Sequence, residues 1–495
     1  MDIKDIHIQH CQTKPVNSRS NSTATELAQT LKWPFCRKTC HIGLSHFFSA
    51  VAYGRVAVPI LPASSANEVD NILEHSESTV LFVSKNLLSK VSEQRLQCMR
   101  LVYAIENFGL IRENAVESGF LVPRTPHPDT LAAIIYTSGT SGKAKGVMLS
   151  HANLCYSVVE ACHAQLATHR DRWLSILPMA HTYELALGML YPFYVGASVY
   201  YLQGIPAPSV LLNAMREVRP TIILTVPLIA EKIYRTISGK IENSKFLSWM
   251  LRHTPTLLYS VAGWALRQQT GGKIRFFGIG GAKLNPEVEQ FYKRTRFNYA
   301  IGYGTTETAP LICNACVGKT AIGTVGVAAY GVEVKLENVD ETTGVGEIVA
   351  KGRNVMMGYY KDPERTSSVL SPDGYYHTGD LAVLDHKGRY IIKGRLGNMI
   401  VGPSGENIYP EEIEQVISDY PGVQESLVIQ RERSLVALVR LREETVKQSM
   451  STIAENIKKY VNNRVNKHSA LSTVQIVTSP FMKTATLKIR RNIYK

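Results

Sequence analysis

The chain has 495 residues, of which 45% are apolar and 19% are charged. This composition excludes wholesale disorder, and the length exceeds what one compact core supports, so we expect two or three domains. The formal charge of +14 does not by itself indicate nucleic-acid binding, because the 55 Lys and Arg residues are spread along the chain and concentrate only in residues 483–495. Binding of polyanionic cofactors, or contact with an anionic membrane surface, explains the sign equally well.

The eight cysteines are irregularly spaced, and no apolar segment near residue 1 indicates secretion. We therefore expect reduced thiols and a cytoplasmic protein, with membrane association left open. Cys313 and Cys316 form a lone CxxC with no second pair or histidine at metal spacing, which favours ordinary core or loop thiols over a zinc site.

One stretch is apolar enough to be weighed as a membrane span. Between Arg172 and Arg216 the only formally charged residue is Glu184. Gly188 and Pro192 interrupt the run, and residues 195–201 have the pattern of a buried strand. A buried core segment is the favoured interpretation.

In chain order, residues 1–40 are polar and show no sustained period. From about residue 41 the pattern alternates: a helix at 46–53, a strand at 56–61, a helix near 68–75 and a strand at 79–83. Further buried strands are predicted at 222–226 and 273–279. The alternation predicts an α/β fold with mostly parallel sheets flanked by helices.

From about residue 331 the pattern changes to short alternating strands at 332–336, 346–351 and 389–393, which predict a small β-barrel-like lobe. The last hundred residues combine a helix at 410–418, a hairpin at 426–441, a helix through 453–465 and a strand at 473–477. They predict a small, mobile α+β domain. We leave residues 1–40 without an assigned domain. Residues 41–394 are assigned to a large domain and residues 395–495 to the small one.

The most informative stretch is residues 136–146 (YTSGTSGKAKG), which follows the apolar run 131–135. A helix is expected after it, because Leu154, Val158, Cys162 and Leu166 recur every four positions and Ser150 is a suitable N-cap. A strand, a loop of small residues and a helix form a phosphate cradle, in which backbone N–H groups, hydroxyls and lysines meet an anion. A flexible Gly/Ser linker is the alternative.

Two common cradles are excluded by spacing. A Walker A loop needs Gly-Lys-Ser/Thr, but Gly142 and Lys143 are followed by Ala144. A dinucleotide-binding fingerprint needs a third glycine where Lys283 and Glu307 stand in the nearest candidates. The stretch resembles instead the Ser/Thr-Gly-Thr-Thr-Gly-x-Pro-Lys-Gly signature of the AMP-forming, or acyl-adenylate-forming, enzymes. The resemblance implies that the nucleotide phosphates meet Thr137, Ser138, Gly139, Thr140, Ser141, Gly142 and Lys145.

Further stretches match the family's motifs in the family's order, and the resemblance covers about 90% of the chain. In residues 301–307 (IGYGTTE), it implies that Tyr303 stacks on adenine beside Gly304 and Thr305, that Thr306 meets the α-phosphate, and that Glu307 holds Mg²⁺. Alone, a glutamate at a strand end is ordinarily just solvated.

The remaining matches supply the other parts of such a site. By resemblance, Gly280, Gly281 and Ala282 form the adenine-side loop, Asp380 chelates the ribose hydroxyls, and Arg395 contacts ribose or phosphate. Residues 177–184 (LPMAHTYE) are closest to the long-chain fatty acid members and place His181 near the substrate carboxylate, although a lone histidine is usually a satisfied core residue. In the last domain, Gly405 would border the pantetheine channel and Lys488 would contact the carboxylate and α-phosphate during adenylation.

The resemblance therefore implies an AMP-forming acid–thiol ligase, most similar to long-chain fatty acid–CoA ligases, that uses ATP, Mg²⁺ and coenzyme A. Alternatives are an acyl-AMP ligase that loads a carrier protein and a non-catalytic relative that binds an acyl-adenylate or lipid. Three departures stand out: Ala144 replaces the loop proline, an upstream segment common in relatives is lacking, and Gly397 replaces the usual hinge Lys or Asp. No nucleic-acid partner is expected, and a peripheral membrane contact stays open, as do chain length, oligomeric state and pathway.

Overall fold

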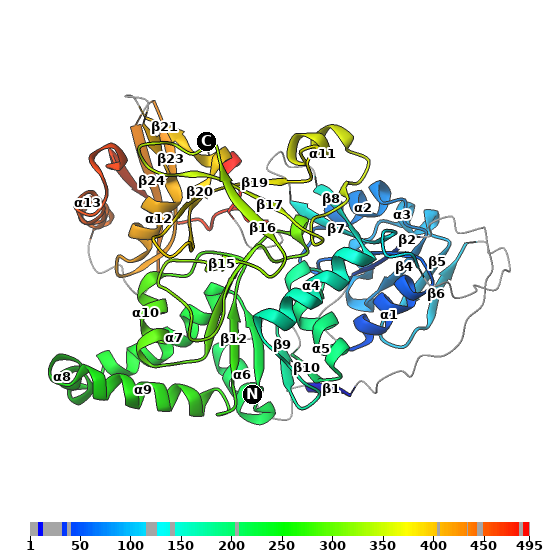
Figure 1. Ribbon diagram of the computed structural model, residues 1–495, viewed down its shortest axis with the longest axis horizontal. Helices are drawn as coiled ribbons and strands as arrows, with labels where there is room; N and C mark the ends of the chain where they lie inside the picture. Colours follow the sequence, from blue (N-terminus) through cyan, green and yellow to red (C-terminus); the bar gives the residue numbers. More distant parts are fainter. Residues whose placement is uncertain are drawn as a thin grey trace. The chain divides into compact units, whose positions relative to one another are not determined.

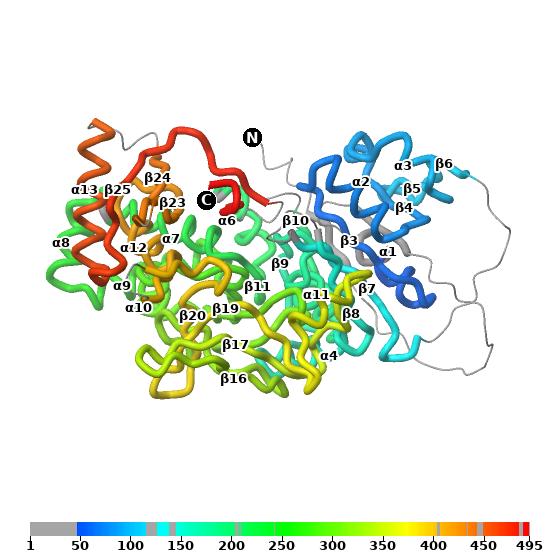
Figure 2. The backbone as a smooth tube through the Cα atoms, turned by 90° about the horizontal axis from the view of Figure 1, so that it is seen from above, coloured from blue at the N-terminus to red at the C-terminus, as the bar shows by residue number. Residues whose placement is uncertain are grey.

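The computed structural model describes residues 8–12, 32–36, 41–114, 126–138, 144–202, 207–402, 406–432, 434–442, 449–484 and 489–494. These residues divide into two compact units (Figures 1 and 2). The first is built chiefly from Met1–Thr137, Ala144–Val334 and Ala350–Tyr376, and the second chiefly from Lys335–Val349 and His377–Lys495. The two units are described separately.

The first unit contains two eight-stranded sheets, which we call sheet I and sheet II. Sheet I has the spatial order β1 (Ile8–Gln12), β10 (Ser198–Leu202), β9 (Arg172–Ser175), β11 (Ile222–Thr225), β12 (Phe276–Ile279), β13 (Tyr299–Tyr303), β14 (Cys313–Ala315) and β15 (Val327–Ala328). The five strands from β10 to β13 run parallel, and the outer strands β1, β14 and β15 pair antiparallel.

Sheet II has the order β18 (Gly358–Tyr359), β8 (Ala144–Ser150), β7 (Leu131–Ser138), β3 (Val56–Ile60), β2 (Lys32–Cys36), β4 (Val80–Val83), β5 (Leu101–Ala104) and β6 (Leu110–Glu113). Helix α1 (His41–Ala52) packs with Ala57 in one apolar cluster, whereas α2 (Ala66–His75) and α3 (Glu93–Cys98) pack with Val56 and Val58 in another. Successive strand residues point to opposite faces, so these helices cover both faces of sheet II. The predicted α/β fold with mostly parallel sheets is confirmed.

Except for α11 (Pro363–Val369), which packs beside β18 of sheet II, the remaining helices of the first unit flank sheet I or extend from it. They are α4 (His151–Ala164), the π-helical η3 (Glu184–Leu190), α5 (Tyr191–Val195), α6 (Pro208–Val218), α7 (Pro227–Glu242), α8 (Lys245–His253), α9 (Pro255–Gln269) and α10 (Pro286–Arg294). Buried residues of α4, α6, α7, α9 and α10 belong to one apolar cluster with β9, β11 and β12.

The second unit has three smaller sheets. One is four-stranded, with the order β16 (Glu333–Glu337), β17 (Gly346–Lys351), β19 (Tyr376–Leu384) and β20 (Tyr390–Arg395). Another pairs β21 (Ile400–Val401) with β22 (Asn407–Ile408), and the third joins β23 (Val423–Arg431), β24 (Ser434–Leu441) and β25 (Thr473–Ile476). Helices α12 (Pro410–Ser418) and α13 (Met450–Asn462) share an apolar core with that last sheet.

The structure differs from the sequence-based expectation around the glycine-rich loop. Residues 144–150 form strand β8 before the helix begins, so the local order is strand, loop, strand, helix. Val147 and Leu149 are buried. The segment forms a strand because it pairs with β18, which lies some two hundred residues later in the chain. Ser150 is the N-cap of α4 as predicted, whereas the helix ends at Ala164 and leaves Leu166 exposed.

Two further strands were not predicted. β1 and β2 lie in the segment 1–40, where the sequence shows no period; β1 pairs with β10 of sheet I, and β2 runs parallel between β3 and β4 of sheet II. The apolar stretch after Arg172 forms η3, α5 and β10, in agreement with a buried core segment. Within the described ranges, no helix combines the length and apolarity needed to cross a bilayer.

Candidate active site

The parallel strands β11, β12 and β13 end at one edge of sheet I, and two predicted elements meet there. Gly280 and Gly281 follow β12, and Gly304 follows β13. The Gly280 N–H donates to the Thr225 carbonyl over 3.1 Å, and Gly281 has φ +86°, a conformation that favours glycine. A Cβ on Gly304 would lie 1.8 Å from the Pro310 carbonyl oxygen, so only glycine fits.

This edge is where open α/β sheets commonly bind ligands. The predicted adenine elements, which include Ala282 and Thr305, are thus brought together on neighbouring strands, and their role in adenine binding stays a prediction.

Glu307 is the centre of a buried polar cluster. It lies in the short helix η4 (Thr306–Thr308) after β13 and is 5% exposed. Its Oε1 accepts hydrogen bonds from Lys145 Nζ and from the Tyr359 hydroxyl, each over 2.8 Å. The Lys145 ammonium also donates to the Tyr359 oxygen over 2.9 Å and lies 4.7 Å from the centre of its ring.

Strand pairing explains why these three residues meet. Lys145 lies on β8 and Tyr359 on β18, and these strands pair antiparallel with Tyr359 opposite Val147. The Met356 N–H donates to the Glu307 carbonyl over 2.8 Å, which fixes η4 against the segment that leads into β18. The sequence placed Lys145 and Glu307 in one site, and the structure brings them into contact.

The Glu307 carboxylate is held in its ionised form. Burial alone would raise the pKa of this group, but the Lys145 charge and the hydrogen bonds from Lys145 and Tyr359 outweigh that effect and lower its pKa below the usual value. An ionised carboxylate is a ligand type that Mg²⁺ prefers. Among the described residues, no three His, Cys, Asp or Glu side chains are grouped to hold a metal ion, so Glu307 would have to act with phosphate oxygens and water.

Thr137 supplies a polar group that fits a phosphate. Its Oγ1 is buried near the end of β7 and finds no hydrogen-bond partner among the residues that the structure describes. A buried hydroxyl without a partner is costly, and a phosphate oxygen would satisfy it. The side chain of Ser138 and the predicted contacts Gly139, Thr140, Ser141 and Gly142 lie outside the described part of the chain. Thr306, the predicted α-phosphate contact, is the first residue of η4.

Glu184 is a second buried carboxyl group, which the sequence did not assign. It begins η3, and its Oε1 accepts a short hydrogen bond from Ser175 Oγ, whereas its Oε2 is buried with no partner among the described residues. Burial raises the pKa of Glu184 to about 8, although the Ser175 hydrogen bond opposes the shift. Gly188 lies one turn after Glu184, and a Cβ at this position would lie 2.4 Å from the carboxyl group. A larger residue than glycine would therefore clash with Glu184.

His181 and Tyr183 precede this carboxyl group on the same segment. His181 is half-buried in the turn after β9, and its carbonyl accepts from the Leu185 N–H over 2.8 Å at the start of η3. A Cβ on Gly278 would lie 3.1 Å from the Tyr183 hydroxyl, so Tyr183 reaches β12. The predicted contact between His181 and a substrate carboxylate stays a prediction.

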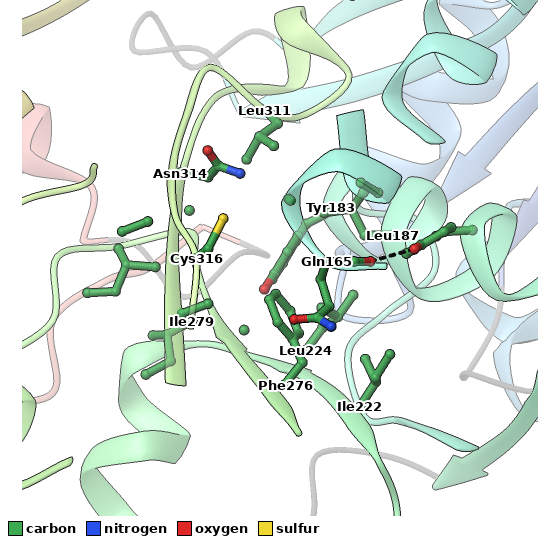
Figure 3. Close-up of a pocket in the computed structure, with 18 of the residues that line it drawn as sticks. Gln165, Tyr183, Leu187, Ile222, Leu224, Phe276, Ile279, Leu311, Asn314 and Cys316 are labelled. Carbon is green, nitrogen blue, oxygen red and sulfur yellow. Dashed lines mark hydrogen bonds between the residues drawn. The ribbon is translucent and has the colours of Figure 1, made fainter. Parts of the chain in front are cut away.

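An apolar pocket lies between α4, η3 and the strands of sheet I (Figure 3). Figure 3 shows the Tyr183 ring extending from its helix toward Phe276 and Ile279. The lining carries no charged side chain; its members are Ala161, Ala164, Gln165, Trp173, Tyr183, Leu187, Tyr191, Ile222, Leu224, Phe276, Gly278, Ile279, Ala300, Ile301, Gly302, Leu311, Asn314, Ala315 and Cys316. The strands that carry the adenine-side loop thus also line the pocket, together with buried residues of the apolar core.

The CxxC pair does not form a metal site with the described residues. Cys316 lines the apolar pocket, and Cys313 is fully buried in β14. Burial raises the pKa of the Cys313 thiol far above its usual value. Both cysteines therefore agree with the interpretation as ordinary thiols.

In the second unit, Asp380 and Arg395 form an ion pair. They are opposite residues of the antiparallel strands β19 and β20, and Arg395 Nε lies 2.7 Å from Asp380 Oδ1. Asp380 is buried, while half of the Arg395 side chain is exposed. Gly379 has φ +69°, and its N–H donates to Glu347 Oε1 over 2.9 Å, which fixes the backbone of β19 directly before Asp380. Their contacts with ribose stay predictions.

The two predicted residues of the last domain, Gly405 and Lys488, lie outside the described ranges. Neighbouring basic residues of the chain end are not merely solvated. Lys483 pairs with Glu425, and Arg491 pairs with the buried Glu414. Burial raises the pKa of Glu414 to about 7, although the Arg491 charge opposes the shift.

Sequence reasoning missed Tyr359 and the buried state of Glu184. Tyr359 carries no motif and reaches Glu307 only through the pairing of β18 with β8, which connects residues more than two hundred positions apart. Glu184 did leave a signal, because it is the only formally charged residue between Arg172 and Arg216. An isolated charge in so apolar a stretch indicates a buried, functional or neutral group.

The family comparison agrees with this arrangement of strands and loops. The model of the AMP-binding enzyme family matches residues 43–360, and the model of the AMP-binding enzyme C-terminal domain matches residues 412–488. The chain belongs to the AMP-binding enzyme family. It is therefore an AMP-forming ligase that uses ATP to activate an acid as an adenylate.

Similar proteins include long chain acyl-CoA synthetase 1 of Arabidopsis thaliana, which is 30% identical over 90% of this chain and 79% of its own length. A chloroplastic long-chain-fatty-acid–[acyl-carrier-protein] ligase of the same plant is 28% identical over 74% of this chain and 60% of its own length. Among solved structures, the o-succinylbenzoate CoA synthetase of Bacillus subtilis in complex with ATP and magnesium ion has a TM-score of 0.75 at 22% identity and covers 93% of this chain and 88% of its own. That similarity shows the fold alone.

Proposed function

We propose that this AMP-forming ligase activates a long-chain fatty acid with ATP and Mg²⁺ and transfers the acyl group to coenzyme A. The observation that carries the proposal is the apolar pocket, which α4, η3 and the strands that carry the adenine-side loop line without a charged side chain. The similarity to an acyl-CoA synthetase named for long-chain substrates supports it.

The pocket lining favours an unsubstituted aliphatic chain. Its side chains with a polar atom are Gln165, Trp173, Tyr183, Tyr191, Asn314 and Cys316, and none of them is charged. A substrate with a second carboxylate would lose its hydration without meeting a cation, which is costly. Each methylene that enters such a pocket contributes about 0.8 kcal/mol, or roughly a fourfold gain in binding.

The residues divide the chemistry as follows. The acid oxygen attacks the α-phosphorus, the bond to pyrophosphate breaks, and the thiol later displaces AMP from the acyl carbon. The Thr137 hydroxyl and the loop that follows it position the phosphates, and His181 orients the carboxylate. Glu307 would hold Mg²⁺, which would neutralise phosphate charge, while the Lys145 ammonium keeps Glu307 ionised. Lys488 contacts the transferring oxygens during adenylation.

The similarity to a carrier-protein ligase favours one second candidate, in which the acyl group passes to a carrier-protein pantetheine. Both acceptors present a pantetheine thiol, so the two candidate functions are distinguished by supplying one acceptor at a time. AMP release would be measured with coenzyme A or with pantetheinylated carrier protein. Release with coenzyme A at saturating acid supports the first proposal, and release with the carrier alone supports the second.

The substrate proposal is tested by ATP–pyrophosphate exchange with a series of straight-chain monocarboxylic acids and with dicarboxylic acids of equal length. We expect kcat/KM to rise about fourfold per added methylene until the pocket is filled, and the dicarboxylic acids to be poor substrates. Ala164→Phe, which narrows the pocket, should shift the optimum to shorter acids. Ala152→Phe, on the first turn of the same helix, is the matched control. A flat response to chain length would refute the proposal.

A further inference from the structure

Helices α8 and α9 form a hairpin that carries large apolar side chains on its outer surface. Only Thr254 separates the two helices. In Figure 1 they extend beside α7 and α10 as an arm of the first unit. Their inward faces are filled by buried residues such as Met250, Leu258 and Leu266, so the hairpin is anchored in the core independently of its outer face.

The outer residues form one row on each helix. On α8, Phe246 and Trp249 are 65% and 53% exposed, and the Trp249 ring continues the row to His253 with centroids 5.1 Å apart. On α9, the row at spacings of four and three residues is Leu257, Val261 and Trp264, which are 45% to 63% exposed. Two of the four tryptophans of the chain thus face solvent on one hairpin.

The charged residues of the hairpin itself have a single sign. The sequence contains no Asp or Glu between Glu242 and Glu287, whereas Lys245, Arg252, Arg267 and Lys273 fall within this span. Lys245 and Arg252 flank the aromatic row of α8, and both are exposed. Exposed Trp, Phe and Leu side chains beside Lys and Arg are the pattern of helices that lie in the interfacial layer of a membrane.

We propose that the α8–α9 hairpin is a docking surface for an anionic lipid bilayer. The aromatic rows would enter the boundary between headgroups and acyl chains, where amphipathic Trp rings are favoured, and the cations would meet lipid phosphates. A second copy of the chain fits this surface less well, because a symmetric contact would set the Lys245 and Arg252 cations of two copies against one another. The inference does not depend on the acyl substrate.

The test measures binding of the whole protein to vesicles by sedimentation, without ATP or acid. Vesicles consist of phosphatidylcholine alone or of phosphatidylcholine mixed with phosphatidylglycerol. We expect binding to the mixed vesicles, and weaker binding in high salt. Lys245→Gln/Arg252→Gln should reduce the partition constant about 30-fold, at about fivefold per cation. Trp249→Ala/Trp264→Ala should reduce it by about tenfold or more.

Controls separate docking from folding and from general stickiness. Tyr194→Ala/Leu384→Ala removes two exposed apolar side chains elsewhere and should bind like the wild type. Each hairpin variant should keep the wild-type melting temperature and exchange activity in solution. Brominated lipids should quench wild-type tryptophan emission much more than that of the tryptophan double variant. Failure of the wild type to bind mixed vesicles, or equal binding by the hairpin variants, overturns the proposal; so does a wild-type dimer that the tryptophan double variant abolishes while vesicle binding is unchanged.

Discussion

Lys145 Nζ lies 2.8 Å from Glu307 Oε1, and this ion pair connects strand β8 of sheet II to the helix that follows β13 of sheet I. Tyr359 donates to the same oxygen. The pair is nearly buried on the Glu307 side, with 7% of that side chain exposed, and partly open on the Lys145 side, with 24% exposed. One contact therefore joins the two large sheets and sets the charge of the candidate metal ligand.

Lys145→Met should destabilise the first unit by about 3 kcal/mol, because it leaves the buried Glu307 carboxylate without its cation. Chemical denaturation of the variant measures the loss. The double variant Lys145→Met/Glu307→Gln is the control, since it removes the uncompensated charge together with the cation. It should be more stable than Lys145→Met alone; equal stability would mean that the two side chains are not coupled.

Glu307→Gln should lower the rate of adenylation by about 10²–10³-fold, the effect of losing one preorganised electrostatic group. ATP–pyrophosphate exchange measures this half-reaction directly. Tyr359→Phe is a matched control, because it removes the hydroxyl that donates to Glu307 and accepts from Lys145, and leaves the Lys145 pair and the Glu307 charge in place. Near-normal exchange by Glu307→Gln would exclude the assigned role.

The parts of the fold that local patterns specify were predicted, and the parts that depend on distant pairing were not. Ser150 was predicted as an N-cap because the capping box is local. Strand β8 was not predicted, because its pairing with β18 joins segments some two hundred residues apart. Residues 8–12 and 32–36 show no sustained period that would predict a strand, yet they pair with neighbouring strands of the two sheets.

Glu184 should make stability depend on pH. Burial raises its pKa in the folded protein to about 8 from an ordinary value of 4.5, so the folded state binds the proton more tightly than the unfolded state. The contribution of Glu184 to the free energy of unfolding is then largest below about pH 4.5 and falls as the pH rises toward 8. Glu184→Gln keeps the shape of the neutral acid and should remove this decline, with a gain on the order of 1–3 kcal/mol above pH 8.

Thermal unfolding between pH 5 and 9 tests that expectation. Glu160 requires a separate control, because burial also raises its pKa, to about 9, with the same sign. Glu160→Gln should also reduce the decline of stability with rising pH, and its effect should extend to higher pH than the effect of Glu184→Gln. A slope that neither variant changes would show that other groups control the pH dependence.

Asp380→Asn should raise the KM for ATP about 10- to 100-fold if the carboxylate chelates the ribose, since hydrogen bonds to charged groups contribute about 1.5–3 kcal/mol. The diagnostic comparison uses 2′-deoxy-ATP. The wild type should lose affinity for the deoxynucleotide, whereas Asp380→Asn should discriminate far less. Equal discrimination by both proteins would assign Asp380 to holding Arg395 in place rather than to the ribose.

Lys488→Ala should nearly abolish formation of acyl-adenylate from acid and ATP, yet largely preserve thioester formation from preformed acyl-adenylate. The two half-reactions are measured separately. The structure restricts the choice of controls, because Lys483 and Arg491 hold Glu425 and Glu414 and their removal would disturb packing. Arg490→Ala is the preferred control. Equal impairment of both half-reactions by Lys488→Ala would contradict the assigned role.

The candidate site shows the same division between local and distant information. Glu307 and Lys145 lie in motifs that can be recognised from a few residues, and their placement in one site was expected, whereas their direct contact was not. Tyr359, which completes the cluster, lies outside any motif. The apolar pocket draws single residues from many elements, and no window of the sequence reveals that they share one lining.

The most direct test of the account is a product analysis of the purified protein with a long-chain saturated fatty acid, ATP, Mg²⁺ and coenzyme A. We predict that acyl-CoA, AMP and pyrophosphate appear in equal amounts, and that omission of coenzyme A leaves fatty acid-dependent ATP–pyrophosphate exchange. Formation of ADP and phosphate, or the absence of exchange with acids of every length, would contradict the account.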